Sequence, residues 1–141
     1  MAAAPPAAKS RQTQNKVLII DDSVTVRELL SMTFRNAGYE VEQARDGEDA
    51  WKKLNEDPTI DVAFCDIEMP KLNGLDLLSR IQEDQSLTHI PIAMLTSRGA
   101  QKMQKIAADR GAKGYFVKPY LEEVLLDAAA KMIEGENLLA F

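Results

Sequence analysis

The residues best able to do chemistry are acidic side chains that directly follow short apolar segments. Asp66 follows the apolar segment 60–65, and the pair Asp21 and Asp22 follows the apolar segment 17–20. One aspartate at such a position is often only a turn residue, because its side chain hydrogen-bonds to nearby backbone amides. Three carboxylates at the ends of neighbouring strands would have another use, because together they could bind a divalent cation.

A hydroxyl group, an amine and a phenol accompany these acids. Thr96 and Lys118 each follow a further apolar segment, and Tyr115 is expected near the exit of the segment that precedes Lys118. Taken singly, Thr96 could be an ordinary hydroxyl near a helix, and Tyr115 could simply pack against the sheet. An amine and a hydroxyl beside a carboxylate–cation cluster are suited to contact the oxygens of a phosphoryl group.

Strands and helices are expected to alternate along the chain. Short runs of branched apolar residues predict strands, and apolar residues three and four apart predict helices. Strict alternation with short loops predicts an α/β fold, in which helices cover both faces of a parallel sheet and the crossovers are right-handed. Five strands suit the doubly wound order 2-1-3-4-5. The expected strands are 17–20, 39–44, 60–65, 90–95 and 114–117, and the expected helices are 24–37, 48–56, 75–83, 99–110 and 121–133.

The ends and faces of the helices are also predicted. Ser23 is expected to cap the first helix, since a serine side chain there accepts a bond from a free backbone amide. Helical spacing places Leu29, Leu121 and Val124 on buried faces. Residues 138 and 139 are both leucine, and the sequence leaves open whether they dock on the domain or fray.

The acids are expected to meet at one edge of the sheet. In an open parallel sheet, ligands bind at the carboxyl ends of the strands where the strand order reverses, which here lies between the first and third strands. Unpaired carboxylates in one crevice would repel each other, and Mg²⁺ removes this conflict because it prefers oxygen ligands. We expect Asp22 and Asp66 to be direct ligands, Asp21 to act through a water molecule, and the backbone carbonyl of Glu68 to be a third protein oxygen.

This arrangement favours phosphoryl chemistry at one carboxylate. Lys118 would balance an additional anion, and Thr96 would offer it a hydroxyl. A carboxylate can act as a nucleophile and form an aspartyl phosphate. Asp66 is the candidate, because it is central among the other polar residues.

Length and composition limit the alternatives. The 141 residues suit one domain, which we place at 16–134, after an Ala/Pro-rich flexible tail or linker at 1–15 and before a C-terminal tail at 135–141. The net charge of −5 argues against binding to nucleic acid or to anionic membranes. There is no apolar run long enough to cross a bilayer and no secretory signal, so we expect a cytoplasmic protein. The single cysteine, Cys65, is expected to be a small buried hydrophobe.

Several stretches resemble one known family. VLIIDDS, FCDIEMPKLNGLDLL, PIAMLTS and GYFVKPY are similar to the receiver domain of two-component response regulators, with its flavodoxin-like, CheY-like fold, over residues 16–133. The resemblance implies a signalling module that catalyses only its own phosphorylation and dephosphorylation. It also implies that the Lys118–Pro119 peptide bond is cis. The implied roles are phosphoacceptor for Asp66, Mg²⁺ binding for Asp21 and Asp22, switch hydroxyl for Thr96, phosphate contact for Lys118 and switch aromatic for Tyr115.

The resemblance also implies partners. The phosphoryl group would come from a histidine kinase or a histidine phosphotransfer domain. Phosphorylation would change the face formed by the fourth helix, fifth strand and fifth helix, around Lys102, Lys105, Tyr115 and Leu121, and so control the binding of a downstream target. The wording of DDSVTVRELLSMTF, CDIEMP and AMLTSRGA is most similar to receivers of chemotaxis-type (CheA-like) hybrid histidine kinases in pilus-based motility.

Other interpretations remain open at this point. The chain could be a stand-alone Mg²⁺-dependent phosphohydrolase, although such enzymes have Asp two positions beyond the nucleophile and this chain has Glu68. It could also be a constitutive binding module in which phosphorylation has no role. Glu68 is expected to affect the lifetime of the aspartyl phosphate, and His89 to be a surface loop residue far from Asp66. The donor is expected to dock around Val24, Thr25, Glu28, Pro119 and Tyr120.

Overall fold

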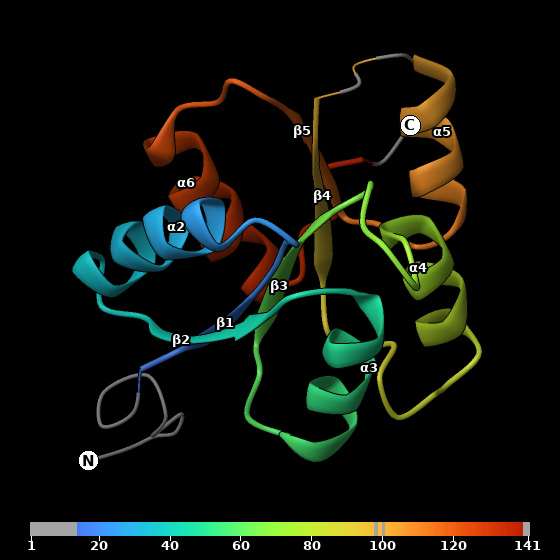
Figure 1. Cartoon of the computed structure of the whole chain (residues 1–141), viewed down its shortest axis with the longest axis horizontal. Coiled ribbons are helices and arrows are strands. Elements are labelled where there is room, and N and C mark those ends of the chain that lie inside the picture. The colour runs from blue at the N-terminus through green and yellow to red at the C-terminus, as the bar shows by residue number, and fades with distance from the viewer. Residues whose placement is uncertain (1–13, 98, 100, 140–141) are drawn as a thin grey trace.

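The computed structural model describes residues 14–97, 99 and 101–139, so most of the predicted tail at 1–15 lies outside the described residues. Five parallel strands form one sheet in the order β2-β1-β3-β4-β5, as predicted (Figure 1). The strands are β1 (Lys16–Ile20), β2 (Glu40–Ala44), β3 (Val62–Asp66), β4 (Ile92–Thr96) and β5 (Gly114–Val117), and the helices are α2 (Val24–Asn36), α3 (Gly47–Glu56), α4 (Gly74–Gln82), α5 (Gln101–Asp109) and α6 (Glu122–Ile133).

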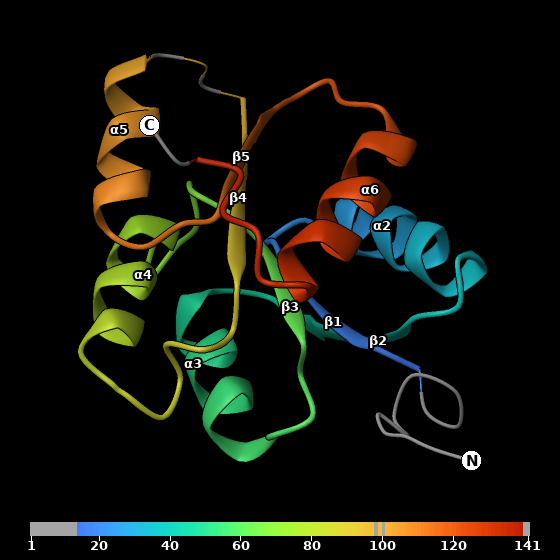
Figure 2. The ribbon, with the colours of Figure 1, turned by 180° about the vertical axis from the view of Figure 1, so that it is seen from behind.

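Two layers of helices cover the sheet. Helices α2 and α6 pack on one face, and α3, α4 and α5 pack on the other (Figures 1 and 2). Successive residues of a strand point to opposite faces, so Val17 and Ile19 enter the α2/α6 core, whereas Leu18 and Ile20 enter the other core. Burial on both faces explains why β1, β3 and β4 are continuous apolar runs.

Local signals set the helix boundaries. The side chain of Ser23 accepts a hydrogen bond from the Val26 amide, so this residue caps α2 as predicted. Asp46 and Asn73 cap α3 and α4 in the same way. Helix α3 therefore begins at Gly47, one residue earlier than the predicted helix 48–56.

Some predicted core positions are wrong. Leu29 is 59% exposed, Leu121 is 63% exposed and Val124 is 42% exposed. Leu121 precedes α6 as its cap residue, and Leu29 lines a groove between α2 and α6. Helical spacing alone therefore overestimates the width of the buried face, because only a narrow strip of α2 and of α6 is buried against the rest of the domain. Leu77 of α4, which was not predicted to be buried, is fully buried.

The residues after α6 dock on the domain as far as the structure describes them. The backbone N–H of Leu138 donates to the carbonyl of Lys113, and Leu139 is buried in the α3/α4/α5 core. Residues 140 and 141, part of the predicted C-terminal tail, lie outside the described residues.

Candidate functional site

The three predicted acids lie together. Strand β1 is paired with β3 in parallel register, with Ile20 opposite Cys65, so both strands end at the same edge of the sheet. One carboxylate oxygen from each of Asp21, Asp22 and Asp66 lies within 4.8 Å of the others. Asp21 and Asp66 are buried, and Asp22 is exposed. The crevice thus contains two carboxylates with little access to water and one that faces solvent.

The turn that carries the acidic pair is fixed by hydrogen bonds. The Asp21 amide donates to the Ala44 carbonyl at 3.1 Å, and Asp21 Oδ1 accepts a bond from the Ser23 amide at 2.8 Å. Asp21 Oδ2 is buried and has no hydrogen-bond partner. Lys118 Nζ lies 3.6 Å from this oxygen, which is an ion-pair distance but too long for a good hydrogen bond.

Burial, and secondly the charges of neighbouring carboxylates, raise the pKa values of Asp66 and Asp21. The pKa of Asp66 is raised from 3.8 to about 6, first by burial and then by the charge of Asp21, and Lys118 and the Glu68 amide oppose these effects. The pKa of Asp21 is also raised, again chiefly by burial. Without a cation, the folded protein therefore pays an electrostatic cost for keeping Asp66 ionised.

These residues fit a bound divalent cation. Three carboxylates converge, one of their buried oxygens lacks a hydrogen-bond partner, and burial together with the charge of Asp21 raises the pKa of the central acid. Oxygen ligands supplied by one or two carboxylates are the usual protein contribution to a Mg²⁺ site.

The other predicted polar residues lie on the adjoining strands. Thr96 is the last residue of β4 and is fully buried, and its carbonyl accepts a bond from the Lys118 amide at 2.7 Å. The Lys118–Pro119 peptide bond is cis. Tyr115 is half-buried and lies inside β5, opposite Met94, instead of at the exit of the strand.

The loop after Asp66 is held tightly at two glycines. The Gly74 amide donates to the Ile67 carbonyl at 2.8 Å, and a Cβ on Gly74 would lie 2.5 Å from the Asp66 carbonyl oxygen. A Cβ on Gly47 would lie 2.1 Å from the carbonyl oxygen of Leu72. Close backbone approach thus fixes the path of the loop that carries Glu68, the predicted source of a backbone ligand.

Two further residues lie near the acids: Arg27 was not predicted to take part, and Tyr120 was predicted only as part of the donor docking surface. Arg27 Nη1 donates to the Asp21 carbonyl at 2.7 Å. Burial and then the charges of Asp21 and Asp66 raise the pKa of Tyr120, so its phenol lies within the field of the acidic cluster. The sequence does carry one signal for Arg27: it lies in the first turns of α2, and a side chain there can reach back to the end of β1. This signal was not part of the prediction.

The remaining singled-out residues lie elsewhere. Cys65 is fully buried and burial raises the pKa of its thiol, which agrees with a structural role. His89 is exposed and lines a hollow of about 380 Å³ together with Asp61 and Lys113, near the amino ends of the strands. This hollow is at the opposite edge of the sheet from Asp66. Within the described residues, no helix is both long and apolar enough to cross a membrane.

The chain belongs to the response regulator receiver domain family, whose sequence profile matches residues 17–130. Receiver domains are signalling modules. The chain is 38% identical over 123 residues to the chemotaxis protein CheY1 of Helicobacter pylori, which covers 86% of this chain and 98% of that protein. It is 33% identical to the chemotaxis protein CheY of Pseudomonas aeruginosa over the same shares of the two chains.

Solved structures show the same fold. The chemotaxis response regulator CheY4 of Vibrio cholerae superposes with a TM-score of 0.78 at 34% identity, over 86% of this chain and 99% of that one. The receiver domain of a histidine kinase from Syntrophus aciditrophicus gives a TM-score of 0.79 at 26% identity, over 86% of this chain and 91% of that one. The predicted fold class and family are therefore confirmed.

Proposed function

We propose that this receiver takes a phosphoryl group from a phosphohistidine donor onto Asp66 with the help of Mg²⁺. The observation that carries the proposal is the convergence of Asp21, Asp22 and Asp66 at the carboxyl edge of the sheet. Family membership supports the same chemistry, and similarity to chemotaxis proteins supports a role in chemotaxis signalling. A role in pilus-based motility rests only on the resemblance of the sequence to receivers of chemotaxis-type hybrid kinases.

The chain's own residues have distinct tasks in this scheme. Asp22, Asp66 and the Glu68 carbonyl would hold Mg²⁺, with Asp21 contacting it through water. When bound, the cation supplies positive charge that draws the pKa of Asp66 down and neutralises phosphoryl oxygens. An ionised Asp66 oxygen attacks phosphorus, an O–P bond forms, and the P–N bond to the donor imidazole breaks.

Lys118 and Thr96 would receive the new group. Lys118 Nζ lies 3.6 Å from Asp21 Oδ2, so its ammonium has an acidic partner that a phosphoryl group on Asp66 would compete with. The Thr96 hydroxyl, at the end of the neighbouring strand β4, would donate to a phosphoryl oxygen. Both residues thus respond to the charge that phosphorylation adds.

The output face would be α5, β5 and α6. Thr96 ends the strand that pairs with β5, with Thr96 opposite Val117. A movement of Thr96 toward the phosphoryl group would open space near β5, and Tyr115 would turn inward to fill it. A downstream protein would recognise the altered face.

Labelling with acetyl phosphate tests the proposal. The wild type with Mg²⁺ should acquire one acid-labile phosphoryl group, and both Asp66→Asn and chelation of Mg²⁺ should abolish it. Asp109→Asn, an exposed acid on α5, serves as the control and should be labelled like the wild type. Labelling that survives in Asp66→Asn would refute the assignment, and multiple turnover of phosphomonoesters would favour a phosphohydrolase.

A further inference from the structure

We infer that Arg27 and Gln43 are positioning residues for the acidic pair: Gln43 orients the Arg27 guanidinium, which fixes the peptide unit between Asp21 and Asp22. This inference rests on the proposed function only in so far as the pair binds Mg²⁺. Neither residue is expected to touch the cation.

The contact with the acidic pair is direct. Arg27 Nη1 donates to the Asp21 carbonyl at 2.7 Å, which is a short bond for an N–H donor. The Asp21 amide on the other side of the residue donates to the Ala44 carbonyl. Because the carbonyl of Asp21 belongs to the same rigid peptide unit as the amide of Asp22, the guanidinium sets the direction in which Asp22 leaves the strand.

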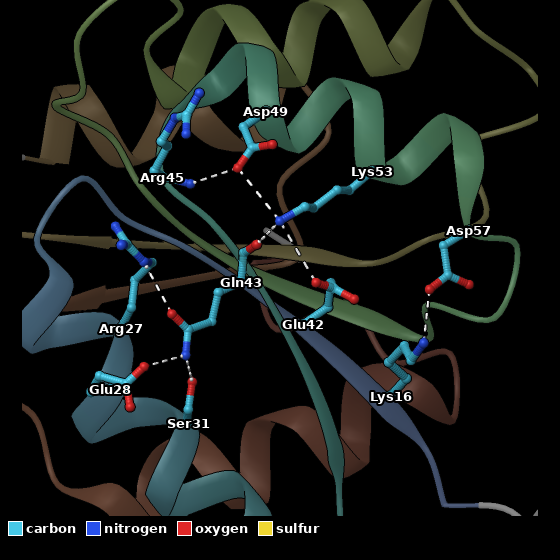
Figure 3. A network of polar contacts seen from close by, with 10 residues as sticks. All are labelled: Lys16, Arg27, Glu28, Ser31, Glu42, Gln43, Arg45, Asp49, Lys53 and Asp57. Atoms are coloured by element: carbon cyan, nitrogen blue, oxygen red, sulfur yellow. Dashed lines mark hydrogen bonds and ion pairs between the residues drawn. The ribbon is translucent and has the colours of Figure 1, made fainter.

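Gln43 holds the guanidinium in place from the edge strand β2. Its Oε1 accepts a bond from Arg27 Nε at 3.1 Å (Figure 3). Its Nε2 donates to Glu28 at 2.8 Å and to Ser31 at 2.9 Å. Both hydrogens of the amide are therefore engaged, so its oxygen must face Arg27.

The strand that carries Gln43 is itself tied to α3. The ammonium of Lys53 donates to the Gln43 carbonyl and lies within ion-pair distance of Glu42 and Asp49 (Figure 3). The chain of contacts thus runs from α3 through β2 and Arg27 to the Asp21 carbonyl. Each link is a hydrogen bond or ion pair between described residues.

Positioning and simple electrostatics predict opposite results for the loss of Arg27. A positive charge near the acids repels Mg²⁺, so removing only the charge would strengthen Mg²⁺ binding. Loss of the bond to the Asp21 carbonyl would instead release Asp22 from its alignment and weaken Mg²⁺ binding. The sign of the change therefore separates the two roles.

The experiment compares Mg²⁺ binding to the purified full chain by calorimetry. Arg27→Gln should weaken binding about tenfold, the usual scale for groups that orient metal ligands. Arg35→Gln is the matched control: it removes one positive charge from α2 about two turns further on, and binding should be unchanged or slightly tighter. Gln43→Met, which alters no charge, should weaken binding in the same direction as Arg27→Gln.

A second readout needs no cation. In the metal-free protein, the amide signal of Asp22 in an NMR spectrum should shift in Arg27→Gln and Gln43→Met but not in Arg35→Gln, because the bond to the preceding carbonyl is lost. Mg²⁺ binding by Arg27→Gln as tight as that of Arg35→Gln, with an unmoved Asp22 signal, would overturn the inference. Failure of the wild type to bind Mg²⁺ would count against the proposed function, and the Asp22 signal would still decide the role of Arg27.

Discussion

Replacing Asp66 by Asn should stabilise the metal-free protein. The raised pKa of Asp66, about 6 against 3.8, means that ionisation of this group is less favourable in the folded chain than in the unfolded chain. The cost is fully present above pH 6, shrinks as the pH falls through 6, and is absent below 3.8. A difference of roughly two pKa units corresponds to about 3 kcal/mol at pH 7.5.

Urea denaturation in the presence of a chelator measures this effect. At pH 7.5 the free energy of unfolding of Asp66→Asn should exceed that of the wild type by about 2 to 3 kcal/mol, and the gap should close toward pH 4. Asp109→Asn removes an exposed carboxylate that pairs with Lys105, and it should change stability by less than about 1 kcal/mol.

Mg²⁺ should close much of this gap in stability between Asp66→Asn and the wild type. At a free concentration one hundred times its Kd, the cation would stabilise the wild type by about 2.7 kcal/mol, whereas Asp66→Asn has lost a ligand and should gain less. If Asp66→Asn is no more stable than the wild type at pH 7.5 without Mg²⁺, the conclusion that burial and the charge of Asp21 disfavour ionisation of Asp66 is wrong.

Three further changes have defined outcomes. Gly47→Ala places a Cβ 2.1 Å from the Leu72 carbonyl oxygen and should lower the free energy of unfolding by about 1 to 3 kcal/mol in urea titrations; an unchanged value would show that the loop yields freely. Asp57→Asn should lower the free energy of unfolding by about 1 kcal/mol at pH 7 after allowance for solvent screening, because the hydrogen bond from Lys16 lowers the pKa of Asp57 to about 2. This stabilisation is present above pH 3.8 and is lost as the pH falls through 2. A difference between variant and wild type that is independent of pH would contradict the assignment. Thr96→Val should weaken binding of beryllofluoride, a phosphoryl mimic, about tenfold through loss of one charge-assisted hydrogen bond, whereas Thr96→Ser should bind it like the wild type. Equal affinities of the two variants for beryllofluoride would show that the hydroxyl does not contact the phosphoryl group.

The sequence predicts the fold well because its signals are local and repeated. Buried strands such as β3 are runs of apolar residues, and caps such as Ser23 act on the adjacent turn. The meeting of Asp21 and Asp66 follows from strand order alone, since parallel strands that are neighbours end at the same edge.

What the sequence did not predict depends on distances between elements. Leu29 has the spacing of a core residue, but its burial depends on how closely α6 approaches α2. The role of Arg27 depends on Gln43, which is 16 positions away in β2. The raised pKa of Asp66 likewise depends on how deeply the carboxyl lies and on the charge of Asp21.

The most direct test of the central claim is a crystal structure of the chain with Mg²⁺ and beryllofluoride. The account predicts beryllofluoride on Asp66, with Mg²⁺ bound by Asp22, Asp66 and the Glu68 carbonyl, and with Lys118 and Thr96 in contact with fluorine atoms. Beryllofluoride on another residue, or Mg²⁺ bound away from these carboxylates, would contradict it.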